Sequence, residues 1–504
     1  MFLKREKPVI YLEIAGNIPR VKGIQDIISK RPSFLDIIET IVRRGKRSAG
    51  IFAEISTTNL TLSEAWELKR AIEIVRKYGV KTVAYIREAG IPELFLSESF
   101  NKVYTSERSY FNLIGFSSTL NTFGDFFKKI KVKIESVKSG KLKSIPDLLS
   151  KSEVPDEIKR DVKRIIDGIY ETLCKEVKRF PGNVFISGIL SSKELLLSGA
   201  VDGITNESIS NIIKKEFGTS EIEFVRKPIQ IVKFKRGKTV AILDMIGTIS
   251  ENPSPNFISL SRYSEVINRL TENDNIQAVI VRVNSRGGDA TVSEMILEKL
   301  KNMSLNKELT ISISSIAASG GYLISLASNE IFATPFSLIG SIGVFLIKPY
   351  IGELLSSIGI KSEIVGKGEL SSIFSAYKEL SPKEKSVLQN LVREEHEKFI
   401  KVVAETRKIP EEKVRKIADG SVFTGKDSKE LKLINDTRSI ADIFDHINEQ
   451  YAIEEYPKLT IFDIMKVGTF QSLFDADTEF LLNLLREKYT LLSYLPLNLT
   501  NLCP

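Results

Sequence analysis

The chain has 504 residues, 42% of them hydrophobic and 27% charged, which is ordinary for soluble globular proteins and predicts two or three domains. Its net charge of +8 comes with acidic residues interspersed almost everywhere, and no basic helix with interleaved aromatic residues occurs, so nucleic-acid binding is not indicated. Two distant cysteines and two isolated histidines provide neither a disulfide framework nor a metal site.

Hydrophobic patterns typical of strands and helices alternate along both halves of the chain. In the first half we expect strands at residues 8–14, 49–55 and 80–86, and helices at 34–44 and 61–77, with Ser63 as an N-cap or first-turn residue. In the second half we expect strands at 239–249, 277–283, 309–316, 330–333 and 337–346, and helices at 259–271, 291–303, 322–328, 381–407 and 410–418. This alternation predicts α/β units with mostly parallel sheets.

The two halves of the chain repeat each other. Ile114-Gly115 in the first half matches Ile342-Gly343 in the second, and the same offset in residue number joins Ala89 to Ala317. A common offset across several short identities indicates an internal duplication. We therefore expect an N-terminal α/β repeat at 1–215, a linker with an edge strand at 216–238, a C-terminal α/β repeat at 239–447, and a tail at 448–504 that resembles neither repeat.

Ser319 lies in the segment Ala318-Ser319-Gly320-Gly321, between an expected strand and an expected helix. Backbone N–H groups are unpaired at the start of a helix, and the helix dipole favours negative charge there. A nucleophile at this junction can share those donors with an oxyanion. Taken alone, the segment is better explained as a tight turn of small residues.

A second glycine pair, Gly287-Gly288, follows Asn284-Ser285-Arg286 at the end of a buried strand. A Gly-Gly step leaves backbone N–H groups accessible to a ligand oxygen, because no Cβ stands in the way. Neither of the common phosphate-loop patterns is present. Together with Ser319 one strand later, the pair indicates an oxyanion hole beside a nucleophile.

A serine nucleophile needs a base to take its proton. His396 and His446 lie in charged helical stretches and are expected at the surface, so a Ser-His-Asp triad is not favoured. A lysine is the other choice, because burial lowers the pKa of a lysine enough for it to accept a proton.

These motifs, together with Gly340-Ser341-Ile342-Gly343, resemble the double-length form of signal peptide peptidase A, also called protease IV. The resemblance covers residues 8–440 and is sharpest over 277–345. It implies an α/β fold of two tandem Clp protease/crotonase-like repeats, the first of them degenerate. It also implies a Ser–Lys dyad with the serine from the second repeat and the lysine from the first, no metal or organic cofactor, and a ring-like homo-oligomer such as a tetramer.

Carried over to this sequence, the resemblance makes Ser319 the nucleophile and Lys143 the base. The internal repeat supports this assignment. At the offset that relates the two repeats, Lys143 of the first corresponds to Ser371 of the second, and Ser319 of the second corresponds to Ile91 of the first. Each repeat therefore lacks the catalytic residue that the other retains.

Two lysines close to Lys143, Lys138 and Lys141, are rivals for the same role and are expected to be solvated. The resemblance also gives Ser341 a hydrogen bond to the lysine ammonium, although a turn serine between glycines is an equally good interpretation. The oxyanion hole would consist of the backbone amides of Gly287 or Gly288, with Gly320.

The sequence departs from the family pattern in two places. Arg286 stands where the family usually has proline, which predicts a looser loop. The family usually carries an N-terminal membrane anchor and faces the cell exterior or periplasm, but no signal peptide and no run of about 18 apolar residues is visible here. Either this form is soluble, or it binds membranes peripherally, or its true start lies upstream of Met1.

The expected function is a serine endopeptidase that cleaves extended peptides, such as remnant signal peptides, through an acyl-enzyme. A crotonase-like acyl-CoA enzyme is the enzymatic alternative, since that fold also holds a thioester oxyanion with glycine amides. The tandem repeat and the serine argue against it. A catalytically inactive scaffold that binds peptides is the third interpretation.

Overall fold

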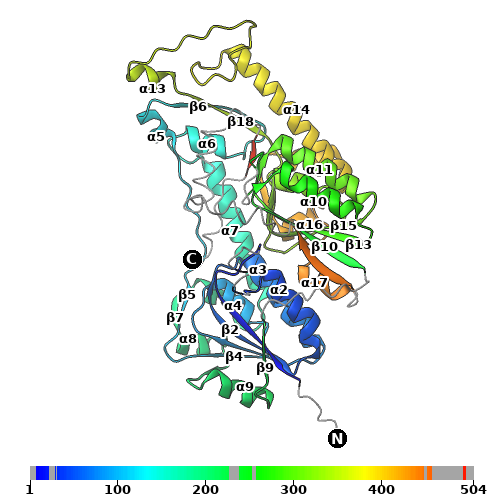
Figure 1. Ribbon diagram of the computed structural model, residues 1–504. Coiled ribbons are helices and arrows are strands. Elements are labelled where there is room, and N and C mark those ends of the chain that lie inside the picture. The colour runs from blue at the N-terminus through cyan, green and yellow to red at the C-terminus, as the bar shows by residue number, and fades with distance from the viewer. Residues whose placement is uncertain are drawn as a thin grey trace.

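The computed structural model describes residues 7–21, 26, 29, 31–225, 238–252, 257–447 and 451–456, and the backbone of residues 492–494. It shows two α/β units, with the large sheet of the first half of the chain low in Figure 1 and the large sheet of the second half above it. The expected alternation of strands and helices is confirmed in both units.

The first unit is built on a sheet of six parallel strands in the order β8-β4-β3-β2-β1-β9. These strands are β1 (Val9–Gly16), β2 (Gly50–Thr58), β3 (Thr82–Ile86), β4 (Lys102–Thr105), β8 (Gly203–Ile204) and β9 (Ile222–Phe224). The helices are α2 (Phe34–Glu39), α3 (Leu62–Lys77), α4 (Ile91–Ser97), α5 (Gly124–Lys129), α6 (Ile145–Ser150), α7 (Asp156–Glu176), α8 (Ser192–Leu197) and α9 (Ile209–Phe217). The remaining elements are the π-helical turn Thr40–Arg44, the 3₁₀ turns Gly45–Arg47 and Gly182–Ile186, the antiparallel pair β5 (Tyr110–Leu113) and β7 (Gly188–Ser191), and β6 (Lys133–Lys138).

The second unit has the same strand order, with β20-β16-β15-β13-β10-β21 as consecutive parallel neighbours. Its strands are β10 (Thr239–Ile246), β11 (Thr248–Ile249), β12 (Phe257–Ile258), β13 (Ile276–Ser285), β14 (Gly287–Asp289), β15 (Glu308–Ala318), β16 (Ile331–Ala333), β17 (Leu338–Gly340), β18 (Phe345–Tyr350), β19 (Val422–Thr424), β20 (Asp436–Thr437) and β21 (Ala452–Tyr456). Its helices are α10 (Leu260–Glu272), α11 (Ala290–Ser304), α12 (Gly320–Ser325), α13 (Gly352–Ser357), α14 (Pro382–Arg407), α15 (Glu411–Ile417), α16 (Gly425–Glu430) and α17 (Ile440–His446). The shared strand order confirms the internal duplication.

The second sheet continues past residue 447, where the sequence suggested that the repeat ends. β21 pairs with β10 just as β9 pairs with β1 in the first unit. The expectation that nothing after residue 447 resembles a repeat is therefore wrong for Ala452–Tyr456. A five-residue edge strand carries too little pattern to be recognised as a repeat from sequence.

A third sheet joins the two halves, with the order β12-β11-β14-β22-β18-β6, in which β22 is Leu492–Tyr494. β6 of the first half runs antiparallel to β18 of the second half, from Lys138 opposite Phe345 to Lys133 opposite Tyr350. Ile145 and Leu149 of α6 pack against Phe345 in a small apolar cluster. The segment that follows β6 is therefore held against the second unit.

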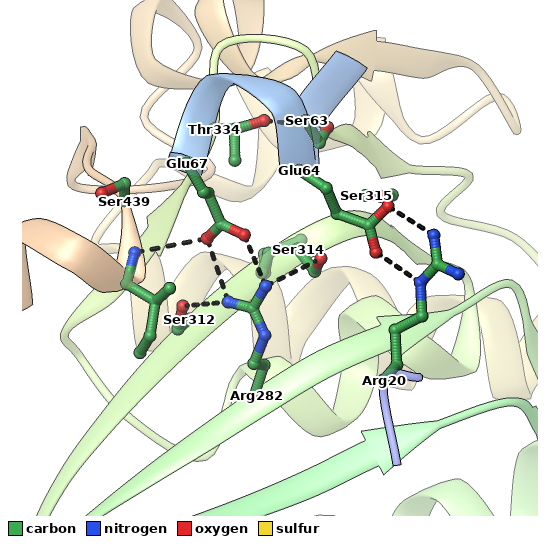
Figure 2. Close-up of polar contacts among 12 residues, drawn as sticks. Arg20, Ser63, Glu64, Glu67, Arg282, Ser312, Ser314, Ser315, Thr334 and Ser439 are labelled. Atoms are coloured by element: carbon green, nitrogen blue, oxygen red, sulfur yellow. Dashed lines mark hydrogen bonds and ion pairs between the residues drawn. The ribbon is translucent and has the colours of Figure 1, made fainter. Parts of the chain in front are cut away.

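Helix α3 is largely buried because it lies between the two units and contacts both α17 and β15. Thr61 caps it through reciprocal hydrogen bonds with Glu64, so Ser63 belongs to its first turn. Figure 2 shows the polar side chains by which this helix meets the second sheet, including the hydrogen bond from Thr334 to Ser63. These contacts set the register of one repeat on the other.

The central contact in Figure 2 is a buried ion pair between Glu67 of α3 and Arg282 of β13. The guanidinium also donates to the hydroxyls of Ser312 and Ser314, and Glu67 accepts a hydrogen bond from the Ile440 amide. Charges this deeply buried are tolerated because each has several partners.

Replacing Glu67 by alanine is expected to destabilise the protein by about 3–5 kcal/mol, because it removes the carboxylate that pairs directly with the buried Arg282 guanidinium. Thermal unfolding followed by circular dichroism measures the loss. Glu73→Ala on the same helix removes a carboxylate that is 25% exposed, and should cost no more than about 1 kcal/mol. Equal shifts in the melting temperature for the two variants would contradict the assigned role.

Among the described residues, no helix combines the length and the apolar composition that crossing a membrane requires.

Candidate active site

Ser319 is the single residue between the end of β15 and the start of α12, and its backbone is strained. Its φ of 57° and ψ of −120° lie in a region that residues with a side chain seldom adopt. The conformation is held by a hydrogen bond from the Ser319 amide to the Gly340 carbonyl, at 2.7 Å. A Cβ on Gly321 would lie 2.4 Å from the Ser285 carbonyl oxygen, so only glycine lets α12 begin this close to β13.

Lys143 reaches the second unit through the short segment that follows β6. The Ser139 amide donates to the Val344 carbonyl at 2.8 Å, and the Leu142 amide donates to the Asp419 carbonyl at 2.7 Å. Gly140 turns the chain between them with a φ of +88°. Backbone contacts on both sides of the segment thus position the lysine of one repeat inside the other.

The structure brings Lys143, Ser319 and Ser341 together in a buried site. Lys143 Nζ lies 2.5 Å from Ser319 Oγ and 3.1 Å from Ser341 Oγ, within hydrogen-bonding distance of both. None of the three residues is more than 1% exposed. Burial holds the pKa of Lys143 well below its ordinary value, because the charged ammonium loses its hydration there. A neutral amine at this position is able to accept the serine proton.

Ser341 occupies a second strained turn, between β17 and β18, with a φ of 51°. Its amide donates to the Ser421 carbonyl at 2.7 Å, which fixes its backbone. Its hydroxyl is therefore directed at the amine by the fold, and the interpretation as a simple turn serine does not account for the contact with Lys143.

Gly287 and Gly288 form β14 with Asp289, beside Ser319. Gly288 has a φ of +152°, and a Cβ on it would lie 1.9 Å from the Ile249 carbonyl oxygen, so no larger residue fits. The Gly287 amide donates to Ser285 Oγ at 3.1 Å, which closes the turn at Arg286 that a proline would otherwise pre-set. The Gly287 amide therefore already has a side-chain acceptor within the turn.

Gly320 is the first residue of α12, so its amide has no acceptor within the helix. It follows Ser319 directly, which places a backbone donor beside the hydroxyl that would attack. The arrangement thus combines a serine, a neutral amine and helix-start amides in one buried place.

Lys138 is not solvated as expected. Its ammonium pairs with Asp147 at 2.5 Å and donates to the Lys143 carbonyl at 3.1 Å, so it braces the segment that carries Lys143. The sequence did not indicate this contact, because Asp147 lies nine positions further along the chain. The side chain of Lys141 lies at the surface, as expected.

The expectation that His396 lies at the surface is wrong. It is partly buried on α14, and burial lowers its pKa. The helix turns this position inward although its neighbours are charged. No hydrogen bond joins His396 to Ser319 among the described residues.

The first repeat contains a feature that sequence reasoning missed. At its equivalent position, next to Ile91, the buried Glu93 carboxylate accepts hydrogen bonds from the amides of Thr58 and Gly90, at 2.8 and 2.9 Å. A side chain of the protein itself therefore holds two backbone donors next to the position that corresponds to Ser319. The signal available in the sequence was a glutamate three positions after a glycine at a helix start.

Gly420 offers a test of how closely the lysine segment must fit. Its φ is +93°, and a Cβ on it would lie 2.5 Å from the Lys143 backbone nitrogen, so Gly420→Ala should displace Lys143 and lower kcat by at least roughly tenfold. Gly359→Ala is the matched control, because Gly359 has a φ of +86° and no atom within 4 Å of its added Cβ. A similar loss of kcat in both variants would attribute the effect to backbone strain in general.

Fold and site together define a protein of tandem α/β repeats that share one buried serine–lysine pair. Residues 75–180 and 301–454, more than half of the chain, match the model of peptidase family S49. The chain belongs to peptidase family S49, and the family expected from the motifs is confirmed.

The chain is similar to "Serine protease SPPA, chloroplastic" of Arabidopsis thaliana, with 25% identity over 447 residues, covering 84% of this chain and 66% of that protein. It is 27% identical to "Protease 4" of Salmonella typhi over 406 residues, covering 74% of this chain and 65% of that protein. The chain therefore spans slightly less than two thirds of these relatives. A solved structure of ClpP1 from Listeria monocytogenes matches 40% of this chain and 94% of its own, with 13% identity and a TM-score of 0.25.

Proposed function

We propose that this protein is a serine endopeptidase in which Ser319 is the nucleophile and Lys143 of the same chain is the general base. The observation that carries the proposal is the 2.5 Å separation of Lys143 Nζ from Ser319 Oγ in a site closed to solvent. Membership of peptidase family S49 and the relatives named as proteases support the same reaction.

The reaction begins when Ser319 Oγ attacks the carbonyl carbon of the scissile peptide bond and neutral Lys143 Nζ takes the hydroxyl proton. The amides of Gly288 and Gly320 stabilise the oxyanion that forms. As the carbon–nitrogen bond breaks, protonated Lys143 gives its proton to the leaving amine. A water molecule, deprotonated by Lys143, then hydrolyses the ester and restores Ser319.

Ser341 holds the amine during this cycle. Its hydroxyl is the second group within hydrogen-bonding distance of Lys143 Nζ, and it keeps the amine aimed at Ser319 in both protonation states. Burial of the Lys143 amine, which lowers its pKa, keeps it neutral before the reaction.

Extended peptides are the proposed substrates, remnant signal peptides among them, as the family resemblance implies. We also propose a homo-oligomer, a tetramer being one such assembly. Apolar side chains between α13 and α14 support it, since Val365 is 96% exposed and Ile358 is 65% exposed. Light scattering on the full chain as it elutes from a gel-filtration column measures the molar mass of the assembly.

The experiment that tests the function compares two substrate classes on the full chain. Fluorogenic extended peptides should be hydrolysed, and an acyl-CoA thioester, assayed by release of the thiol, should not. Turnover of the thioester alone would favour the acyl-CoA enzyme. Peptide binding without turnover would favour the inactive scaffold.

A further inference from the structure

One side chain, that of Ser139, connects the segment that carries Lys143 to the residue just before β18. The Ser139 hydroxyl accepts a hydrogen bond from the Val344 amide at 3.0 Å and donates one to the Val344 carbonyl at 3.1 Å. The Ser139 amide donates to the same carbonyl at 2.8 Å. Ser139 of the first repeat therefore contacts both backbone polar groups of Val344 in the second.

The Val344 amide belongs to the same peptide group as the Gly343 carbonyl. A trans peptide group is planar, so its N–H and its C=O point in opposite directions. Because the N–H is directed at Ser139, the carbonyl is directed away from Ser139 and toward the proposed nucleophile. The Gly343 carbonyl oxygen lies 3.4 Å from Ser319 Oγ. The Ser139 hydroxyl thereby sets the direction of a carbonyl that borders the reacting oxygen.

Glycine makes the orientation of this peptide group easy to change, because a residue without a Cβ has wide conformational freedom. No larger residue fits here. A Cβ on Gly343 would lie 2.9 Å from the Ser139 carbonyl oxygen and 3.1 Å from Lys143 Cε. The position thus requires glycine, and the hydrogen bond from Val344 to Ser139 supplies the restraint that glycine lacks.

The Gly343 carbonyl matters most while Lys143 carries a proton. The ammonium then donates to the hydroxyl oxygens of Ser319 and Ser341, so the Ser319 hydroxyl needs another acceptor for its own proton. The Gly343 carbonyl is within reach for that purpose. It therefore supports the protonated form of Lys143, which burial opposes. When the amine is neutral, the same hydroxyl turns to Lys143 Nζ and is ready to attack.

We propose that Ser139 is a positioning residue of the serine–lysine site, which holds the Gly343–Val344 peptide group with its carbonyl facing Ser319. The inference rests on the proposed function, because it gives Ser139 a part in the same reaction. Ser139 acts through the backbone of the second repeat, so it links the repeat that supplies the lysine to the repeat that supplies the serine.

Hydrolysis of a fluorogenic extended peptide by the full chain, measured across pH, tests the proposal. Ser139→Ala should lower kcat by roughly tenfold and leave KM within about twofold, because it disturbs the alignment of the reacting groups and not the binding of the peptide. The rise of kcat/KM with pH should move to lower pH, because the carbonyl no longer supports protonated Lys143. Ser139→Thr keeps the hydroxyl, and should keep most of kcat and the wild-type pH profile.

Ser150→Ala is the matched control. The Ser150 hydroxyl donates to the Pro146 carbonyl within α6 at 2.7 Å, so its loss should change neither kcat nor the pH profile. An unchanged kcat in Ser139→Ala would overturn the proposal. A loss of kcat with the wild-type pH profile, or an equal loss in Ser139→Thr, would also overturn it, because Ser139 would then only support the fold.

Hydrogen–deuterium exchange at the Val344 amide tests the restraint without relying on activity. Exchange should be faster in Ser139→Ala than in Ser150→Ala, because the amide loses its acceptor. Equal exchange in the two variants would show that Ser139 does not hold this peptide group, and the proposal would fail. If exchange changes as expected but the wild type hydrolyses no peptide, the proposed function fails while the restraint by Ser139 stands.

Discussion

Replacing Ser319 by alanine is expected to lower kcat/KM for peptide hydrolysis by at least roughly 10³-fold, because no other group can form the acyl-enzyme. The fold should survive, since the change removes one hydroxyl and the backbone contact of Ser319 with Gly340 remains. A continuous assay with a fluorogenic peptide measures the loss, and circular dichroism and gel filtration check fold and assembly.

Ser325→Ala provides the matched control for that substitution. Ser325 is equally buried on the same helix, where its hydroxyl donates to the Gly321 carbonyl at 2.8 Å. This variant should keep most of its activity, because the lost hydrogen bond is local to α12. Residual hydrolysis above a few per cent in Ser319→Ala would rule out Ser319 as the nucleophile.

Changing Lys143 to arginine is expected to be as damaging as changing it to alanine, because a guanidinium stays protonated throughout the accessible pH range. In the wild type, kcat/KM should rise with pH through the pKa of Lys143, which burial places well below the ordinary value for lysine. Lys141→Ala should leave the profile unchanged. Lys138→Ala should lower activity without shifting the pH profile, since Lys138 contacts the backbone carbonyl of Lys143 and not its amine.

The same pKa shift makes stability depend on pH. Unfolded Lys143 keeps its proton up to about pH 10.5, whereas folded Lys143 releases it at lower pH, so the unfolded state binds more protons between these two values. The free energy of unfolding should therefore rise with pH across that window. Lys143→Met should melt at a higher temperature than the wild type at neutral pH, with a difference that shrinks toward pH 10.5. A wild type more stable than Lys143→Met at neutral pH would mean that the buried amine is charged.

The elements and the duplication were predictable from the sequence because their signals are local or repeated. Buried strands such as β13 carry an almost continuous run of β-branched residues, and the strand-to-helix turn at Ser319 is marked by adjacent small residues. Family resemblance and the common offset between the two repeats then selected Lys143 over its neighbours Lys138 and Lys141.

What the sequence did not reveal depends on contacts between distant segments. The inward position of His396 and the ion pair of Lys138 with Asp147 follow from packing around α14 and β6, which no periodicity encodes. The pairing of β22 with β14 joins segments that lie far apart in the chain, and a strand as short as Leu492–Tyr494 has too few positions to be predicted from its pattern.

The most direct test of the shared Ser319–Lys143 site is covalent labelling of the full chain with a fluorophosphonate, followed by mass spectrometry of its peptides. The account predicts one labelled serine, Ser319, with labelling that rises with pH in the wild type and is lost in both Ser319→Ala and Lys143→Met. Labelling of Ser319 that persists at the wild-type rate in Lys143→Met would contradict it, because the serine would then be activated without the lysine.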